Sequence, residues 1–170
     1  MTYYDEISKG YDELHGEEQR KKMSIIKSLV EVTHNDRLLD VGCGSGISSD
    51  FDCFVNGIDT SQNLVKVACD KGVDAAVGEA ENLPFDDDSF DFVISVTAIM
   101  NFSDIQKSVS EMARVCKKDG TCIISFLKNS SKKEEILKAV QSYFYILKEI
   151  EEEKDIILML RLTYGDRPEQ

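Results

Sequence analysis

The sequence contains little of what metal, redox and membrane proteins depend on. It has only two histidines, and its five cysteines (Cys43, Cys53, Cys69, Cys116, Cys122) form no Cys-x-x-Cys pair. We therefore predict no metal site, and reduced thiols in a cytoplasmic protein are the simplest interpretation. The longest apolar run, residues 156–160, ends at Arg161 and is too short to cross a membrane. The first 22 residues are too acidic and too polar for a signal peptide.

Basic charge is also scarce. The chain carries 20 lysines and arginines against 32 aspartates and glutamates, which gives a formal net charge of −12. This charge disfavours direct binding to nucleic acid, whose phosphates would be repelled. The hydrophobic content of 42% is that of an ordinary folded protein, and 170 residues suffice for one sizeable core. We therefore expect a single domain spanning residues 1–170.

Short strand-like runs alternate with helical ones, which is typical of a parallel sheet covered by helices. Strands are expected at residues 37–41, 53–59, 73–80, 89–97 and 121–127. Helices are expected in the second half of residues 1–34, from Thr60 or Ser61 to Lys71, and after capping boxes at Ser103–Gln106 and Ser131–Glu134. Residues 145–153 and 155–162 follow each other too closely for a crossover and should form an antiparallel hairpin.

A glycine-rich turn follows the first expected strand: Asp40–Gly46 reads DVGCGSG. Open α/β sheets bind ligands at such turns, because glycine lets a ligand approach the main chain closely. The dinucleotide fingerprint G-x-G-x-x-G would need its third glycine where Ile47 stands. This mismatch disfavours an NAD(P)-dependent oxidoreductase, which we keep as an alternative. A tight strand–helix turn without any ligand is the other alternative.

The segment LLDVGCGSG (38–46) resembles the first motif of the class I S-adenosylmethionine-dependent methyltransferases, in the branch of the ubiquinone and menaquinone methyltransferases. Segments 56–61, 78–95 and 113–125 are similar to further motifs of that family, in the same order and spacing. The resemblance implies an α/β, Rossmann-like doubly wound sheet of five parallel strands plus a C-terminal antiparallel hairpin. It implies an N-terminal helical lid at 1–34, a cofactor-binding core at 35–126, and a helix with the hairpin at 127–164.

The residue types suit a cofactor that carries a sulfonium and no phosphate. Asp40 offers a carboxylate to the ammonium group, and Asp59 sits where a strand-end carboxylate accepts both ribose hydroxyls. The resemblance implies that Glu79 receives the adenine amino group, that Ala80 supplies an N–H to the ring, and that Tyr11 folds over the cofactor. The residues expected to bind S-adenosylmethionine are Tyr11, Asp40, Gly42, Cys43, Gly44, Gly46, Asp59, Thr60, Glu79, Ala80 and Ser95.

Several of these residues have a purely structural alternative. Asp59 could be only a helix N-cap, Glu79 a solvated loop charge, and Tyr11 a cover for the core. Ser95 and Thr97, at the end of the fourth strand, would line the floor near the sulfonium.

No general base is evident, so the catalytic residues stay unassigned. His34 lies in a turn ahead of the first strand and is expected at the surface, while His15 falls near the lid. Met100 and Asn101 stand where many relatives carry a pair of histidines. An amide can orient an acceptor but cannot take its proton at neutral pH.

Two departures from the family's pattern predict an open site. Only about ten residues separate Gly46 from Gly57, and the short segment KNSS (128–131) stands where relatives often insert a substrate lid. An open site suits a macromolecular acceptor or completion by a protein partner, and a small-molecule acceptor stays open. We predict a methyltransferase, with a catalytically weak cofactor-binding scaffold or a partner-dependent subunit as the alternative.

Overall fold

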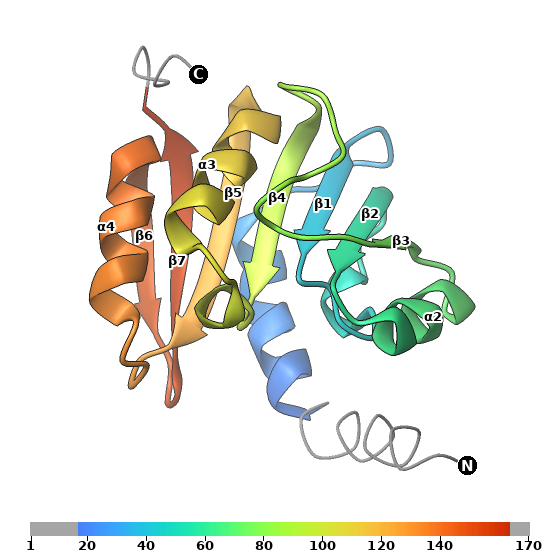
Figure 1. Cartoon of the computed structure of the whole chain (residues 1–170), viewed down its shortest axis with the longest axis horizontal. Helices are drawn as coiled ribbons and strands as arrows, with labels where there is room; N and C mark the ends of the chain where they lie inside the picture. Colours follow the sequence, from blue (N-terminus) through green and yellow to red (C-terminus); the bar gives the residue numbers. More distant parts are fainter. Residues whose placement is uncertain (1–16, 164–170) are drawn as a thin grey trace.

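The computed structural model describes residues 17–163, which build a seven-stranded sheet in the order β3-β2-β1-β4-β5-β7-β6 (Figure 1). The parallel strands are β1 (Arg37–Val41), β2 (Phe54–Asp59), β3 (Asp74–Val77), β4 (Phe90–Val96) and β5 (Cys116–Leu127). The hairpin β6 (Phe144–Glu151) and β7 (Asp155–Leu162) adds two antiparallel strands. The predicted fold class is therefore confirmed.

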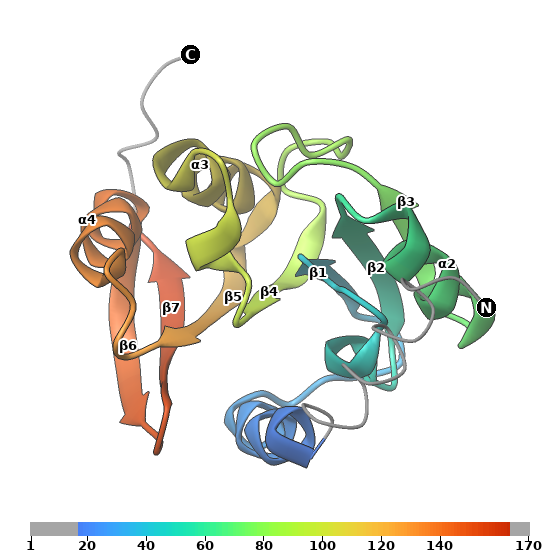
Figure 2. The same ribbon diagram turned by 60° about the horizontal axis from the view of Figure 1, so that its bottom comes forward.

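Helices cover both faces of this sheet. The first helix (17–29) lies on one face, and α3 (Ile105–Val115) and α4 (Lys133–Tyr143) lie on the other (Figure 2). A further helix, α2 (Gln62–Asp70), links β2 to β3, and short 3₁₀ turns η1 (Ile47–Ser49) and η2 (Ile99–Asn101) follow β1 and β4. No helix within residues 17–163 is long and apolar enough to cross a membrane.

The apolar core is divided between the two faces. Met23 and Ile26 of the first helix pack with Ile94 of β4 and neighbouring strand residues. On the opposite face Met112 of α3 and Val140 of α4 belong to the larger cluster. Full burial of side chains of this size stabilises the fold by about 1.5–3 kcal/mol each. Packing on both faces therefore holds the strands whose ends carry the site.

Several predicted boundaries were wrong by a few residues. The N-cap of α3 is Asp104, whose Oδ1 accepts from the Lys107 N–H at 2.9 Å, in place of the predicted Ser103. No side chain caps α4, so the predicted box at Ser131 does not form. Strand β5 begins at Cys116, because Cys116 pairs with Phe90 before the register shifts, and β3 ends at Val77.

Two crossovers lack a regular α-helix. Between β1 and β2 the chain forms only η1, so the predicted shortening of this crossover is present in the structure. Between β3 and β4, residues 78–89 contain no helix and run across the sheet as a loop (Figure 1). That loop begins with Glu79 and Ala80, so its placement bears directly on the site.

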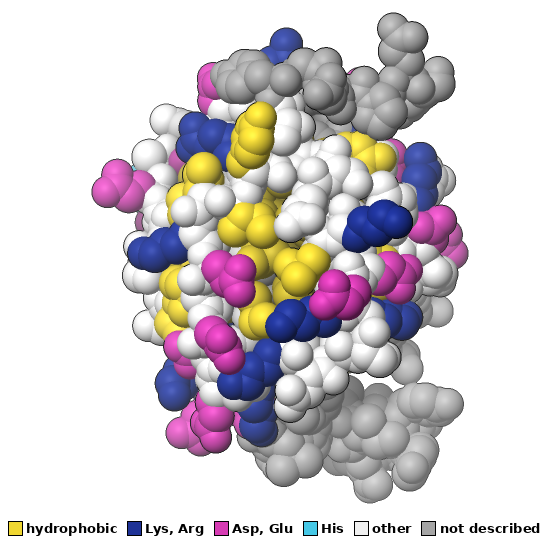
Figure 3. Space-filling view, turned by 90° about the vertical axis from the view of Figure 1, so that its left-hand side faces the viewer, with side chains coloured by type: hydrophobic (Ala, Val, Ile, Leu, Met, Phe, Trp, Pro, Cys, Tyr) yellow, Lys and Arg dark blue, Asp and Glu magenta, His cyan; other side chains and the backbone are white. Residues whose placement is uncertain are grey.

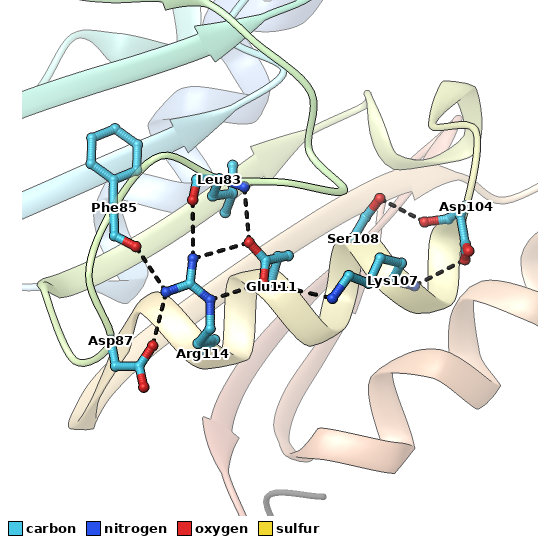
Figure 4. Close-up of polar contacts among 8 residues, drawn as sticks. All are labelled: Leu83, Phe85, Asp87, Asp104, Lys107, Ser108, Glu111 and Arg114. Carbon is cyan, nitrogen blue, oxygen red and sulfur yellow. Dashed lines mark hydrogen bonds and ion pairs between the residues drawn. The ribbon is translucent and has the colours of Figure 1, made fainter. Parts of the chain in front are cut away.

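Arg114 of α3 holds this loop (Figure 4). Its guanidinium donates to the Leu83 and Phe85 carbonyl oxygens at 3.0 and 2.8 Å and to Asp87 Oδ1 at 2.8 Å. Glu111 binds the same guanidinium and also accepts from the Leu83 N–H at 2.8 Å. Burial acts to raise the Glu111 pKa, but the Arg114 and Leu83 hydrogen bonds outweigh it and hold that pKa below its usual value.

The sheet edge at β6 is exposed. Figure 3 looks toward α4 and β6 and shows hydrophobic side chains gathered in the middle of this face, among charged ones. Tyr145 and Leu147 of β6 are 61% and 52% exposed. The register with β7 shifts between Ile146 and Lys148, which leaves Leu147 as an extra residue in the strand.

We expect Arg114→Met to lower the free energy of unfolding by about 2–4 kcal/mol, because it leaves the buried Glu111 and two loop carbonyls without their partner. Urea unfolding followed by circular dichroism measures this loss. Lys107→Met is the matched control in the same helix, since Lys107 is half exposed and 3.9 Å from Glu111. It should cost less than about 0.5 kcal/mol.

The loss of unfolding free energy in Arg114→Met should be smaller in acid than at neutral pH. A carboxyl whose pKa is lowered in the folded state contributes stability above its unfolded pKa and loses it as the pH falls through the lowered value. Equal stabilities of the Arg114→Met and Lys107→Met proteins at neutral pH would contradict this account of the loop.

Candidate functional site

A cavity of about 440 Å³ is lined by residues at the carboxyl ends of β1, β2 and β4. Its walls come from the segments that follow β1, β2, β3 and β4, together with Gln19 of the first helix. The strand order reverses between β1 and β4, and such a switch point opens a crevice where α/β sheets bind ligands.

The structure brings most of the predicted binding residues together. Those that line the cavity are Gly42, Cys43, Gly44, Asp59, Thr60, Glu79 and Ala80. Asp40, Gly46 and Ser95 are not among the lining residues, and both Asp40 and Ser95 are fully buried. Tyr11 lies outside the described residues, as does His15. Roles for the cofactor-binding set stay predictions.

Gly42 and Gly44 are glycines for different reasons. Both have positive φ, at 78° and 53°, which favours glycine. A Cβ on Gly42 would come within 2.6 Å of the Ala98 Cβ, so this glycine allows β1 and the segment after β4 to approach closely. A Cβ on Gly44 would meet no atom within 4 Å. Because Gly44 lines the cavity, this open space is available to a ligand.

The Asp59 carboxylate ties two cavity walls together. Its Oδ2 accepts from the Gly44 N–H at 2.9 Å, and its Oδ1 accepts from the Ser61 N–H at 2.9 Å. The N-cap of α2 is Ser61, whose hydroxyl accepts from the Leu64 N–H, so Asp59 is not the helix cap. Each carboxylate oxygen has about two lone-pair sites, so both oxygens retain capacity for hydroxyl donors in the cavity.

Asp40 is fully buried beneath the glycine turn. Its Oδ2 accepts from the hydroxyls of Ser48 and Ser49 at 2.6 and 2.8 Å, while its Oδ1 has no hydrogen-bond partner in the described part of the chain. Burial raises the Asp40 pKa to about 6, with the charge of Asp59 adding to it and the two hydroxyls acting against it. An unmatched buried carboxylate oxygen calls for a donor or a cation beside it.

Thr97 lines the cavity, whereas Ser95 is fully buried and its hydroxyl has no partner among residues 17–163. Asn101 also lines the wall, as does the ring of Phe102, which sequence reasoning missed. Ser95 and Thr97 share a strand face only while β4 continues, and β4 ends at Val96. Thr97, the next residue, has a left-handed backbone conformation.

Sequence reasoning also missed Lys22, whose ammonium is buried beside Thr97 and Asp155. The signal was available, because Lys22 precedes Ile26 by one helical turn and so continues the apolar face of the first helix. Its two partners lie far along the chain and had no local signature.

Within residues 17–163, no cysteine or histidine suits nucleophilic or base chemistry in this cavity. Burial, with the charges of Asp40 and Asp59, raises the pKa of the Cys43 thiol well above its usual range, which disfavours a thiolate nucleophile. His34 is exposed, as expected, pairs with Asp52 at 3.2 Å, and does not line the cavity. Residues 17–163 contain no group of three or more histidines, cysteines or acids that could hold a metal ion.

The comparisons with known proteins agree on one family. The family model described as a methyltransferase domain matches residues 39–124, about half of the chain. The uncharacterized methyltransferase YcgJ of Bacillus subtilis is 36% identical over 60% of this chain and 45% of its own length. A demethylmenaquinone methyltransferase of Staphylococcus epidermidis is 28% identical over 85% of this chain and 66% of its own length. The chain spans about half the length of the first curated relatives it matches.

A solved complex has the same fold. It joins the Haloferax volcanii Trm112 methyltransferase activator to a candidate methyltransferase. The TM-score is 0.73 at 19% identity, over 95% of this chain and 96% of that chain. At this identity the likeness concerns the fold.

We expect Asp40→Asn to keep or raise the free energy of unfolding near neutral pH, by up to about 3 kcal/mol, because it removes a buried charge with an incomplete set of partners. The amide oxygen can still accept from Ser48 and Ser49. Urea unfolding at about pH 7.5 measures the change.

The contribution of Asp40 to the free energy of unfolding depends on pH with a defined sign. A carboxyl whose folded pKa is raised takes up its proton earlier in the folded state, so the wild type should gain stability from Asp40 as the pH falls from about 7 to about 4. The Asp40→Asn protein should lack this component. A clear loss of stability in Asp40→Asn near neutral pH would contradict the electrostatic account.

Proposed function

Because the chain belongs to the methyltransferase domain family, we propose that it transfers a methyl group from S-adenosylmethionine to an acceptor. The observation that carries the proposal is the Asp59 carboxylate, which stands in the cavity beside the open main chain of Gly44. When bound, this cofactor supplies a methyl group whose bond to the sulfonium sulfur breaks with its electron pair left on sulfur.

The residues present fit such a cofactor. Asp59 has lone pairs left for two ribose hydroxyls, and the space above Gly44 admits a ligand against the main chain. Asp40 is buried beneath the glycine turn, so its charge would act on the ammonium group through water or across the turn and not by direct contact. Glu79 and the N–H of Ala80, on the loop held by Arg114, are assigned to the adenine.

The titratable side chains of the cavity wall limit which acceptor the protein can methylate. Its titratable side chains in the described chain are the carboxylates of Asp59, Glu79 and Glu81 and the thiol of Cys43. None is an evident base near the end of β4, where Thr97 and Asn101 are uncharged. We therefore favour an acceptor that needs little help with its proton, such as an amine or a thiolate.

A partner-dependent subunit is the second candidate. The Haloferax volcanii relative in fold was solved with the Trm112 activator. In this chain the connection after β5 is short, and residues 17–163 bring no evident base to the end of β4. A partner protein could complete the acceptor side of the cavity.

Isothermal titration calorimetry with S-adenosylhomocysteine tests the cofactor assignment. We expect binding by the wild type, and a loss of about tenfold or more in Gly44→Ala, whose methyl group would enter the ligand space, and in Asp59→Asn. Glu149→Gln on β6, away from the cavity, is the control and should bind as the wild type does. Affinity should also fall between about pH 7.5 and pH 5, because protonation removes the Asp40 charge.

The same titration separates the alternatives. Binding of a nicotinamide dinucleotide without S-adenosylhomocysteine would favour the oxidoreductase. Absence of binding by a folded wild type would overturn the assignments of both Gly44 and Asp59.

Tritiated S-adenosylmethionine added to size-fractionated lysate identifies the acceptor class. We expect wild-type protein, and not Asp59→Asn, to move label into one fraction. Label only after addition of a second protein fraction would favour the partner-dependent subunit. Tight cofactor binding with no transfer under either condition would favour a scaffold.

A further inference from the structure

Thr97 is held in an unfavourable backbone conformation on the cavity wall. Its φ is +51°, and of the described non-glycine residues only Asp88 shares a positive φ. Asp88 lies in an exposed turn, where aspartate tolerates this conformation. Thr97 is β-branched, so the same conformation is a true outlier, and outliers of this kind persist where surrounding contacts fix them at functional sites.

Hydrogen bonds from β5 and from the first helix hold Thr97. Its N–H donates to both the carbonyl oxygen and the hydroxyl of Ser125 in β5, at 3.0 and 2.9 Å. The Lys22 ammonium of the first helix donates to Thr97 Oγ1 at 2.6 Å. Lys22 is also 3.2 Å from Asp155 Oδ2 at the start of β7, and the two side chains are only 8% and 9% exposed.

The Lys22 contact excludes one direction for the Thr97 hydroxyl proton. An ammonium has no lone pair, so Thr97 Oγ1 must be the acceptor toward Lys22 and its own proton must point elsewhere. Within residues 17–163, the other oxygens within reach of Thr97 Oγ1 are Asp155 Oδ1 and Ser125 Oγ, both at 3.4 Å. That exceeds the usual 2.5–3.0 Å range for hydroxyl donors, so a lone pair in the cavity would be the better partner.

We propose that the buried pair Lys22–Asp155 positions Thr97 so that its hydroxyl donates to a ligand oxygen or nitrogen in the cavity. Thr97 is then a binding residue, and Lys22 is a positioning residue that links the first helix to the cavity wall. The inference rests on the proposed function, since the ligand is either the cofactor or the methyl acceptor.

A role in stability alone does not explain the pair well. Buried ion pairs commonly contribute no more than apolar side chains of the same size would. Gln19, one turn before Lys22, lines the cavity from the same helix, and its Oε1 is buried without a partner in the described part of the chain. The first helix therefore presents a second polar group to this part of the wall.

Two ligands carry a suitable lone pair. One is the carboxylate of the cofactor's methionine portion, and the other is the acceptor atom or a group beside it. S-adenosylhomocysteine and methylthioadenosine distinguish them, because the latter lacks the amino-acid portion.

The first experiment changes Thr97. Calorimetry measures the affinity of each variant for both compounds, and a second assay measures the transfer of tritium to the lysate fraction that the wild type labels. Thr97→Val removes the hydroxyl and keeps the shape, and Thr97→Ser restores the hydroxyl. If the cofactor is the ligand, Thr97→Val should bind S-adenosylhomocysteine about fivefold to twentyfold more weakly, with methylthioadenosine unchanged. If the acceptor is the ligand, Thr97→Val should bind S-adenosylhomocysteine and methylthioadenosine as the wild type does, and its KM for the labelled fraction should rise. Thr97→Ser should recover either loss.

Thr97→Gly separates binding from structure. Glycine adopts the observed φ without strain, so this variant should melt at the wild-type temperature or higher while showing the Thr97→Val loss. If Thr97 had only a structural role, the melting temperature and the ligand affinity of Thr97→Gly would change in the same direction.

The second experiment removes the pair. Lys22→Met leaves Asp155 buried alone and should lower the melting temperature, whereas Lys22→Met with Asp155→Leu should recover most of it. The double variant should nevertheless keep the binding or KM defect, because Thr97 has lost its positioning partner. Lys27→Met, in the same helix but paired with the exposed Asp50, is the matched control and should change neither.

The outcomes are distinguishable from failure of the proposed function. If the wild type binds no S-adenosylhomocysteine, the cofactor assignment fails. If the wild type binds and transfers, and Thr97→Val and the double variant match it in both affinities and in KM, the positioning role of Lys22 is overturned.

Discussion

The Asp59 carboxylate is the constraint on which the cavity depends. By accepting from Gly44 after β1 and from Ser61 at the start of α2, it fixes the separation of two walls that no regular helix joins. The left-handed Gly44 backbone and the N-terminus of α2 both gain a partner from one side chain. Asp59 also lines the cavity, so the residue that shapes the site is also one proposed to bind the ligand.

Much of this could be predicted from the sequence, because the features are local. Strand–helix alternation predicted the sheet, and the spacing of Asp40, Gly44 and Asp59 predicted that strand ends would meet. The cap of α3 was predicted one residue too early, since Ser103 and Asp104 are both good N-caps and the local sequence does not distinguish them. Lys22 was missed because its partners are distant in sequence, and the burial of Asp40 depends on the serines of η1.

The loop between β3 and β4 shows how a segment without repeating structure can still place side chains. Where a crossover helix would satisfy its own backbone, residues 78–89 depend on the side chains of α3. One arginine and one glutamate, themselves paired, serve a donor and two acceptors of that loop. The side of the cavity formed by Glu79 and Ala80 is thus held in place from α3, a helix that does not line the cavity.

The bulge in β6 affects how the protein behaves when it is concentrated. An unbroken edge strand offers a regular row of N–H and C=O groups on which strands of other molecules can assemble. The extra residue Leu147 interrupts that row, and the charges of Lys148 and Glu149 follow directly. Despite its exposed tyrosine and leucine, this edge is a poor template for fibril growth.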